Sequence, residues 1–97
     1  MSIKFEWDRV KAEANRRKHD VTFEQACDVF RDALALDELD DREDYGEARF
    51  NRTGMVEGRL IVVTYTGRTD VDSGDEVIRI ISARPAERQE RKRYHEV

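Results

Sequence analysis

The sequence has few of the residues that covalent cross-links and metal sites require. It contains a single cysteine, Cys27, so it cannot form an internal disulfide. Its two histidines, His19 and His95, lie far apart in the chain, and with one cysteine they do not make a zinc-binding set. The glycine-rich loops that bind nucleotides and the Gly-x-Ser-x-Gly turn of hydrolases are also absent. We therefore expect neither a metal ion nor a cofactor.

Long apolar runs are missing as well. No segment approaches the ~20 apolar residues of a membrane span, and Met1–Trp7 carries charge where a signal peptide would be apolar. We expect a cytoplasmic protein without membrane contact. The 97 residues suffice for one compact domain, and no repeat or linker divides residues 1–97.

Charge is unevenly distributed along the chain, although the net charge is only −4. The segment Asp37–Glu47 holds seven acidic residues and one arginine, whereas Arg79–Arg93 holds six basic residues and two glutamates. A local basic surface can bind nucleic acid even when the whole protein is acidic. The composition therefore leaves an RNA site open.

Two helices are expected in the first third of the chain. Ile3–Trp7 alternates apolar and charged residues, as a half-buried strand does. Asp8 is a good N-cap for a helix over Arg9–Lys18. Thr22 and Gln25 form a capping-box pattern that begins a second helix. Its apolar positions recur at helical spacing, and we interpret Cys27 among them as a core residue.

The remainder predicts strands followed by a helix. Ala33–Leu36 is a short strand candidate, and the acidic stretch after it is expected to be a loop. Further strands are expected over Ala48–Met55, Arg59–Thr66 and Glu76–Ala83, and a last helix over Pro85–His95. The order β-α-α-β-β-β-β-α predicts an α+β fold in which helices pack on a mostly antiparallel sheet.

The residues left for chemistry are cations and one imidazole. Lys18 and His19 lie at a helix end, Arg68 follows a central strand, and Arg79 and Arg84 lie in and after the last strand. Such groups suit RNA cleavage by the ribose 2′-hydroxyl, which needs proton transfer and positive charge around the phosphate.

Structural explanations for the same residues stay open. Lys18 and His19 can serve as favourable charges at a helix C-terminus. Arg79 can pair with an acid and Arg84 can be solvated. Strict alternation places these two arginines on opposite faces of the strand unless a bulge intervenes. The stripe of Trp7, Lys11, Asn15 and Lys18 can be an ordinary helix edge.

The chain resembles the BrnT toxin family in motifs that follow in order along nearly its whole length. The N-terminal motifs are Phe5-Glu6-Trp7-Asp8, Lys11, Asn15, Lys18-His19, Val21-x-Phe23-Glu24-x-Ala26 and Val29-Phe30. The C-terminal motifs are Gly46-Glu47, Arg49, Leu60-Ile61-Val62-Val63, Tyr65-Thr66, Arg68, Ile78-Arg79-Ile80-Ile81-Ser82-Ala83-Arg84, Ala86, Glu90-Arg91 and Tyr94. Asp20 stands where the family usually has glycine.

The resemblance implies a RelE-like fold and a metal-independent endoribonuclease that blocks growth. It also implies a BrnA-like ribbon-helix-helix antitoxin in a 2:2 heterotetramer, which contacts operator DNA through the antitoxin.

On this basis we expect a catalytic groove in which one imidazole and two guanidinium groups reach the same phosphodiester. Its predicted catalytic residues are Lys18, His19, Arg68 and Arg84, with His19 as proton shuttle. The predicted RNA-binding residues are Lys11, Asn15, Arg79 and Tyr94, with Tyr94 stacking on a base. Two alternatives remain open at this point: a non-catalytic RNA-binding module, and a protein-binding domain whose acidic loop docks a basic partner.

Overall fold

The computed structural model describes residues 2–42 and 46–96. Its elements follow the predicted order and confirm the α+β class. They are β1 (Ile3–Glu6), α1 (Arg9–His19), α2 (Phe23–Val29), β2 (Leu36–Asp40), β3 (Arg49–Val56), β4 (Arg59–Thr69), β5 (Glu76–Pro85) and α3 (Arg88–His95). Within the described residues, no helix is long and apolar enough to cross a membrane.

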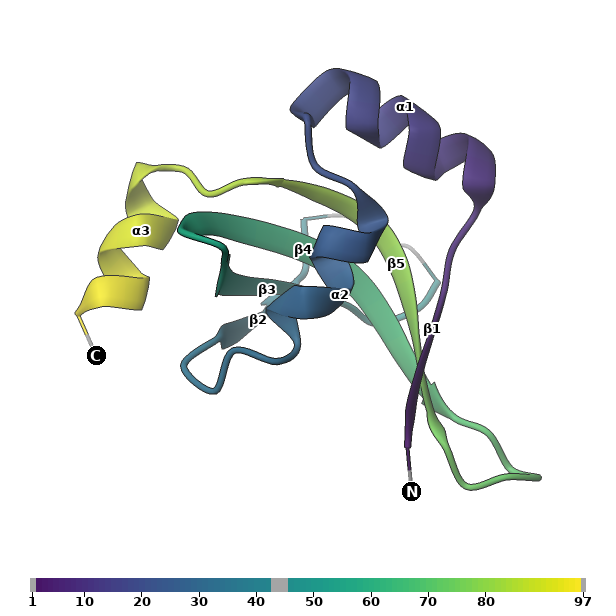
Figure 1. Ribbon diagram of the computed structural model, residues 1–97. Helices are drawn as coiled ribbons and strands as arrows, with labels where there is room; N and C mark the ends of the chain where they lie inside the picture. Colours follow the sequence, from purple (N-terminus) through teal and green to yellow (C-terminus); the bar gives the residue numbers. More distant parts are fainter. Residues whose placement is uncertain (1, 43–45, 97) are drawn as a thin grey trace.

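The strands form a single five-stranded sheet in the order β1-β5-β4-β3-β2. Only β1 pairs in parallel, with β5, and the other neighbours are antiparallel. Figure 1 shows α3 at one end of the sheet and the hairpin between β4 and β5 at the opposite end. Residues at opposite ends of the long strands β4 and β5 therefore lie at opposite ends of the sheet.

The main core lies between the sheet and α2. Phe23, Ala26 and Val29 of α2 are almost fully buried against Ile61 and Val63 of β4. We call the side of the sheet that packs against α2 the covered face. The apolar stripe that the sequence predicted for α2 packs against it. The predicted capping box of Thr22 and Gln25 is present, with both hydrogen bonds formed.

Cys27 lies beside this core and is partly buried. Burial raises the pKa of its thiol to about 11, and the nearby carboxylates of Asp28 and Glu24 add to the effect. The thiol stays protonated near neutral pH, which agrees with a packing role and not with a nucleophile.

A smaller cluster lies on the opposite face, which we call the open face. Leu60, Val62 and Ala86 form it, and Met55 and Tyr94 pack against it. Tyr94 comes from α3, so this cluster is where α3 docks. The docking is reinforced by the Tyr94 hydroxyl, which donates a hydrogen bond of 2.6 Å to Asp32.

The prediction of a strand over Ala33–Leu36 is wrong, and so is the prediction of a loop over residues 37–40. Residues 33–35 form a turn because Asp32 accepts hydrogen bonds from the backbone N–H groups of Leu34 and Ala35. β2 begins at Leu36 and runs to Asp40 at the edge of the sheet. Charged residues suit this position, because they discourage pairing of an exposed edge with another chain. Residues 43–45 of the predicted loop lie outside the described residues.

The prediction that the last helix begins at Pro85 is also wrong. Pro85 is the last residue of β5, and α3 begins at Arg88 with Glu87 as its N-cap. The strand continues this far because Ile61 pairs with Pro85 and the N–H of Ala86 donates to the carbonyl of Leu60. Proline is tolerated here because β1 pairs with β5 only as far as Arg79, so the missing N–H of Pro85 costs no hydrogen bond to a neighbouring strand.

Asp20 adopts the left-handed conformation that makes glycine usual at this position. It caps α1 with φ 56° and ψ 39°, and its N–H donates to the carbonyl of Arg16. We expect Asp20→Gly to raise the free energy of unfolding by about 0.5–1 kcal/mol, because glycine adopts this conformation without strain. Thermal and urea denaturation of the variant measure the change.

The matched control is Asp28→Gly, which places glycine inside α2. It should lower the free energy of unfolding by about 1 kcal/mol, because glycine is a poor helix former. A loss of stability in Asp20→Gly would show that the aspartate side chain is itself favourable at the cap.

Candidate RNA-cleavage site

Asn15 holds α1 against the free edge of β5. Its side-chain amide donates to the carbonyl of Ala83 at 2.8 Å, and its side-chain oxygen accepts from the N–H of Ala83 at 3.1 Å. It also donates to the carbonyl of Val21 at 3.1 Å. The side chain is buried and pairs with both backbone groups of Ala83, as a neighbouring strand would. Asn15 therefore has a structural role, and both of its N–H donors are used inside the protein. Its part in RNA binding remains a prediction.

This contact fixes where His19 lies. His19 follows Asn15 by one helical turn on the same face of α1, so it comes to the C-terminal end of β5. The His19 side chain is partly buried and Lys18 is exposed. Among the described residues, neither side chain has a hydrogen-bond or ion-pair partner. An imidazole and an ammonium group are therefore available at this end of the sheet.

A bulge places the two arginines of β5 on one face. Thr64 pairs with Ser82 but Tyr65 pairs with Ile80, so Ile81 is the extra residue. Ile80 and Ala83 both lie in the core of the covered face. Arg79 and Arg84 consequently both lie on the open face, which is the arrangement that a bulge was expected to produce.

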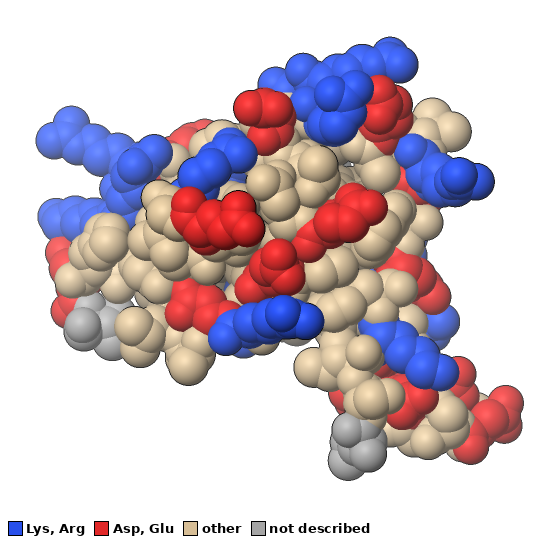
Figure 2. All heavy atoms as spheres, viewed as in Figure 1, with Lys and Arg blue, Asp and Glu red and all other residues tan. Residues whose placement is uncertain are grey.

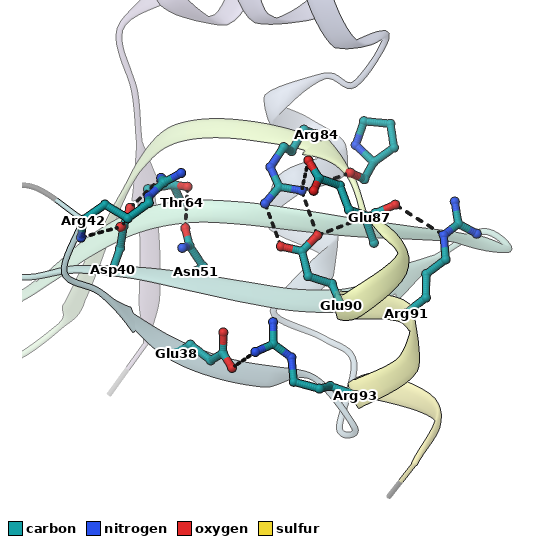
Figure 3. A network of polar contacts seen from close by, with 12 residues as sticks. Glu38, Asp40, Arg42, Asn51, Thr64, Arg84, Glu87, Glu90, Arg91 and Arg93 are labelled. Atoms are coloured by element: carbon teal, nitrogen blue, oxygen red, sulfur yellow. Dashed lines mark hydrogen bonds and ion pairs between the residues drawn. The ribbon is translucent and has the colours of Figure 1, made fainter.

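Arg84 lies between the end of β5 and α3, held by Glu90 in a two-pronged ion pair (Figure 3). Its Nη1 and Nη2 donate to the two carboxylate oxygens of Glu90 at 2.8 and 2.6 Å. Burial opposes ionisation of Glu90, but the bonds from Arg84 and the N–H of Glu87 outweigh it and lower the pKa of this carboxyl. The pair therefore persists at neutral pH, and a phosphate that binds Arg84 must compete with Glu90.

Arg68 is held in the same way at the other end of the sheet. Its two terminal nitrogens donate to Glu6 of β1 at 2.9 and 3.2 Å. Arg79 donates to both oxygens of Glu47 at 2.8 and 2.7 Å. All three predicted arginines therefore have a carboxylate partner inside the protein.

In the structure, Arg68 and Arg84 lie apart on the sheet and do not line one common groove. On β4, Arg68 follows Val62, the partner of Arg84, by six residues. Six residues of strand span about 20 Å, which exceeds the size of a single phosphate group. The prediction that Arg68 acts at the same phosphodiester as Arg84 therefore requires both side chains to leave their carboxylate partners and extend toward each other.

Tyr94 and Lys11 complete the predicted set. Tyr94 packs on the cluster of the open face and donates to Asp32, which raises the pKa of its hydroxyl to about 12. The side chain docks α3 and is partly buried, and stacking of Tyr94 on a base remains a prediction. Lys11 is exposed on α1, one turn before Asn15, and has no ion-pair partner among the described residues.

Sequence reasoning missed the carboxylates that hold the arginines. Glu6 lies 62 residues from Arg68, and Glu47 lies 32 residues from Arg79. No local pattern reveals pairs that the sheet brings together from such separations. It also missed Arg59, whose Nη1 donates to the carbonyl of Asp20 at 3.1 Å beside the end of α1.

Comparison with known proteins places this arrangement in a family. The family model that matches describes the ribonuclease toxin BrnT of type II toxin–antitoxin systems, and it covers residues 7–90. No curated protein matches the chain significantly. The matched region takes in α1, α2, the four strands β2 to β5, and the Arg84–Glu90 pair. The chain therefore belongs to the BrnT family of ribonuclease toxins of type II toxin–antitoxin systems.

Proposed function

We propose that this protein is a metal-independent endoribonuclease that acts in the cytoplasm and inhibits growth. The observation that carries the proposal is the end of α1, where His19 and Lys18 have no side-chain partner among the described residues and Asn15 fixes the helix on β5. The family supplies the substrate class, RNA.

The proposed reaction uses the nucleophile that RNA itself carries. The ribose 2′-oxygen forms a bond to the adjacent phosphorus as the bond from phosphorus to the 5′-oxygen breaks. The products are a 2′,3′-cyclic phosphate and a free 5′-hydroxyl. One proton leaves the 2′-hydroxyl and one reaches the 5′-oxygen, and histidine can carry either because it titrates near neutral pH.

We assign the proton transfer to His19, and the charge that accumulates on the phosphate to Lys18 and Arg84. Lys18 immediately precedes His19, and Arg84 immediately follows Ala83, the residue that Asn15 holds. Positive groups fixed near the phosphate lower the energy of the transition state. For Arg84 this requires that the phosphate displace Glu90, which holds it in the free protein.

The proposal that no metal takes part is supported by the distribution of possible ligands. Across residues 2–42 and 46–96, no three side chains of histidine, cysteine, aspartate or glutamate gather closely enough to hold an ion. Proton transfer by a histidine and charge stabilisation by lysine and arginine can supply the same chemistry.

The family implies an antitoxin partner. We propose that it is a BrnA-like ribbon-helix-helix protein, that the complex contains two toxins and two antitoxins, and that operator DNA is bound through the antitoxin.

The decisive experiment follows RNA and growth together. Purified protein should cut RNA in the presence of EDTA and leave 2′,3′-cyclic phosphate ends, and its expression should stop growth. Co-expression with the antitoxin should restore growth and give a complex with the mass of a 2:2 assembly. Loss of cleavage in EDTA would rule out the metal-free route, and a different mass would rule out that stoichiometry.

One observation favours a second function, a non-catalytic RNA-binding or protein-binding module. Arg68, Arg79 and Arg84 are each paired with a carboxylate, so none of these three presents an unpaired charge to RNA. An RNA-binding module should bind RNA in a salt-sensitive way without producing fragments. A protein-binding module should bind its partner and show no affinity for RNA.

A further inference from the structure

The cations of this protein divide into two groups by their partners. In the part of the chain that the structure describes, most lysines and arginines lie within ion-pair distance of a carboxylate. Those without such a partner are Arg9, Lys11, Lys18, Arg59, Arg88 and Arg91. A phosphate can bind such cations without displacing an internal carboxylate.

Arg59 is the member of this group that reaches from the sheet to the end of α1. Its Nη1 donates to the carbonyl of Asp20, the residue that caps α1 directly after His19. The Arg59 side chain comes from the first residue of β4 and is partly buried. A guanidinium group has five N–H donors. One contact with Asp20 therefore orients the group while most of its donors remain available.

The strand register places Arg59 at a junction of three elements. The next residue, Leu60, accepts a hydrogen bond of 2.8 Å from the N–H of Ala86. Ala86 in turn accepts from Nε of Arg91 in α3 at 3.3 Å. Figure 2 shows lysine and arginine side chains gathered over α1 and over α3, with acidic side chains between them. Arg59 contacts the end of α1, and the residue after it bonds to the segment that leads into α3.

We propose that Arg59 binds a backbone phosphate of the RNA next to His19. This rests on the proposed function in one respect, the assignment of His19 to the reaction. Arginine suits the role because its planar donors match phosphate oxygens and its charge is permanent. Unlike Arg84, Arg59 needs no carboxylate to leave before a phosphate arrives.

The test measures binding of a single-stranded 2′-O-methyl RNA, which lacks the attacking hydroxyl and stays intact. Arg59→Gln keeps an N–H donor for Asp20 but removes the charge. We expect its affinity, measured by fluorescence anisotropy, to fall about 10-fold, as for the loss of one charged hydrogen bond. The slope of log affinity against log salt should decrease by about 0.7, the value for one phosphate contact on a single strand.

Two further variants separate phosphate binding from support of the fold. Arg31→Gln removes an exposed arginine at the end of α2, paired with Asp28, and should bind the probe like the wild type. Arg59→Lys keeps the charge and should keep the salt slope. Equal losses in Arg59→Lys and Arg59→Gln, together with a lower melting temperature, would assign Arg59 to the scaffold alone and overturn the proposal.

Unchanged affinity and slope in Arg59→Gln would also overturn it, as would failure of the wild type to bind the probe. The outcome is distinguishable from failure of the proposed function. A protein that binds RNA through Arg59 but never cuts it refutes the nuclease and leaves the phosphate contact in place. If instead the wild type and Arg59→Gln cut RNA equally well, the phosphate contact of Arg59 is refuted and the nuclease function stands.

Discussion

Replacing His19 with alanine should lower the rate of RNA cleavage by about 10²–10⁴-fold, the range that one general acid or base contributes. The fold should persist, because the His19 side chain makes no hydrogen bond or ion pair among the described residues. The loss should therefore appear in the rate of a single turnover and not in the melting temperature. Binding of uncleavable RNA should change much less than the rate does.

The matched control is the only other histidine of the chain. His95 is exposed at the end of α3, where its ring contacts Tyr94. His95→Ala removes an imidazole with no assigned part in cleavage, so its rate should equal that of the wild type. Full activity in His19→Ala would refute the assignment of proton transfer to His19. Equal losses in both variants would point to a general effect of removing an imidazole.

Local patterns predicted the elements well, because they depend on residues that are close in the chain. The capping box of Thr22 and Gln25 needs only a three-residue spacing, and both of its hydrogen bonds are formed. The side chain of Asp8 likewise accepts from the N–H groups of Val10 and Lys11. Each of these signals satisfies backbone donors that a helix start would otherwise leave without a partner.

The ends of elements were predicted less well where a distant strand decides them. Pro85 looked like the first residue of a helix, since proline is favoured there. It remains in β5 because Ile61 lies beside it across the sheet. Similarly, the acidic run after Leu36 became a strand because Arg52 and Tyr65 provide partners for Asp37. Neither partner can be recognised from the local sequence.

The candidate site illustrates the same limit on a larger scale. The sequence identified the arginines, but their distances from one another depend on register. On β4, Arg68 lies six residues, or about 20 Å of strand, beyond the partner of Arg84, whereas the bulge at Ile81 brings Arg79 and Arg84 to one face. Whether a cation is free to bind phosphate depends further on carboxylates such as Glu6, which lies 62 residues from Arg68.

Two neighbouring polar residues of α1 looked alike in the sequence but have different surroundings in the structure. Lys11 and Asn15 lie one turn apart on α1 and both appeared as RNA-binding candidates. The structure leaves Lys11 exposed and buries Asn15 against Ala83 and Val21. The two positions should therefore respond to alanine in opposite ways, one in stability and the other in RNA affinity.

Asn15→Ala should lower the free energy of unfolding by about 3 kcal/mol, because it leaves a buried N–H and two buried carbonyl groups without a partner. Lys11→Ala should change it by less than about 0.5 kcal/mol, as substitutions at exposed positions usually do. Urea denaturation of both variants gives the comparison. A stability of Asn15→Ala within about 0.5 kcal/mol of the wild type would contradict the view that this amide holds α1 on the sheet.

Asn15→Asp tests the hydrogen bonds more closely, because it preserves the shape of the side chain. An ionised carboxylate can still accept from the N–H of Ala83, but it faces the carbonyl oxygens of Ala83 and Val21 with no proton to donate. At pH 7 we expect Asn15→Asp to lower the free energy of unfolding at least as much as Asn15→Ala does. The difference in unfolding free energy between Asn15→Asp and the wild type should become smaller at low pH, because protonation of the carboxylate restores one donor and removes the charge. A gap that does not change with pH would mean that the amide N–H donors contribute little, and that the shape of the side chain holds the helix in place.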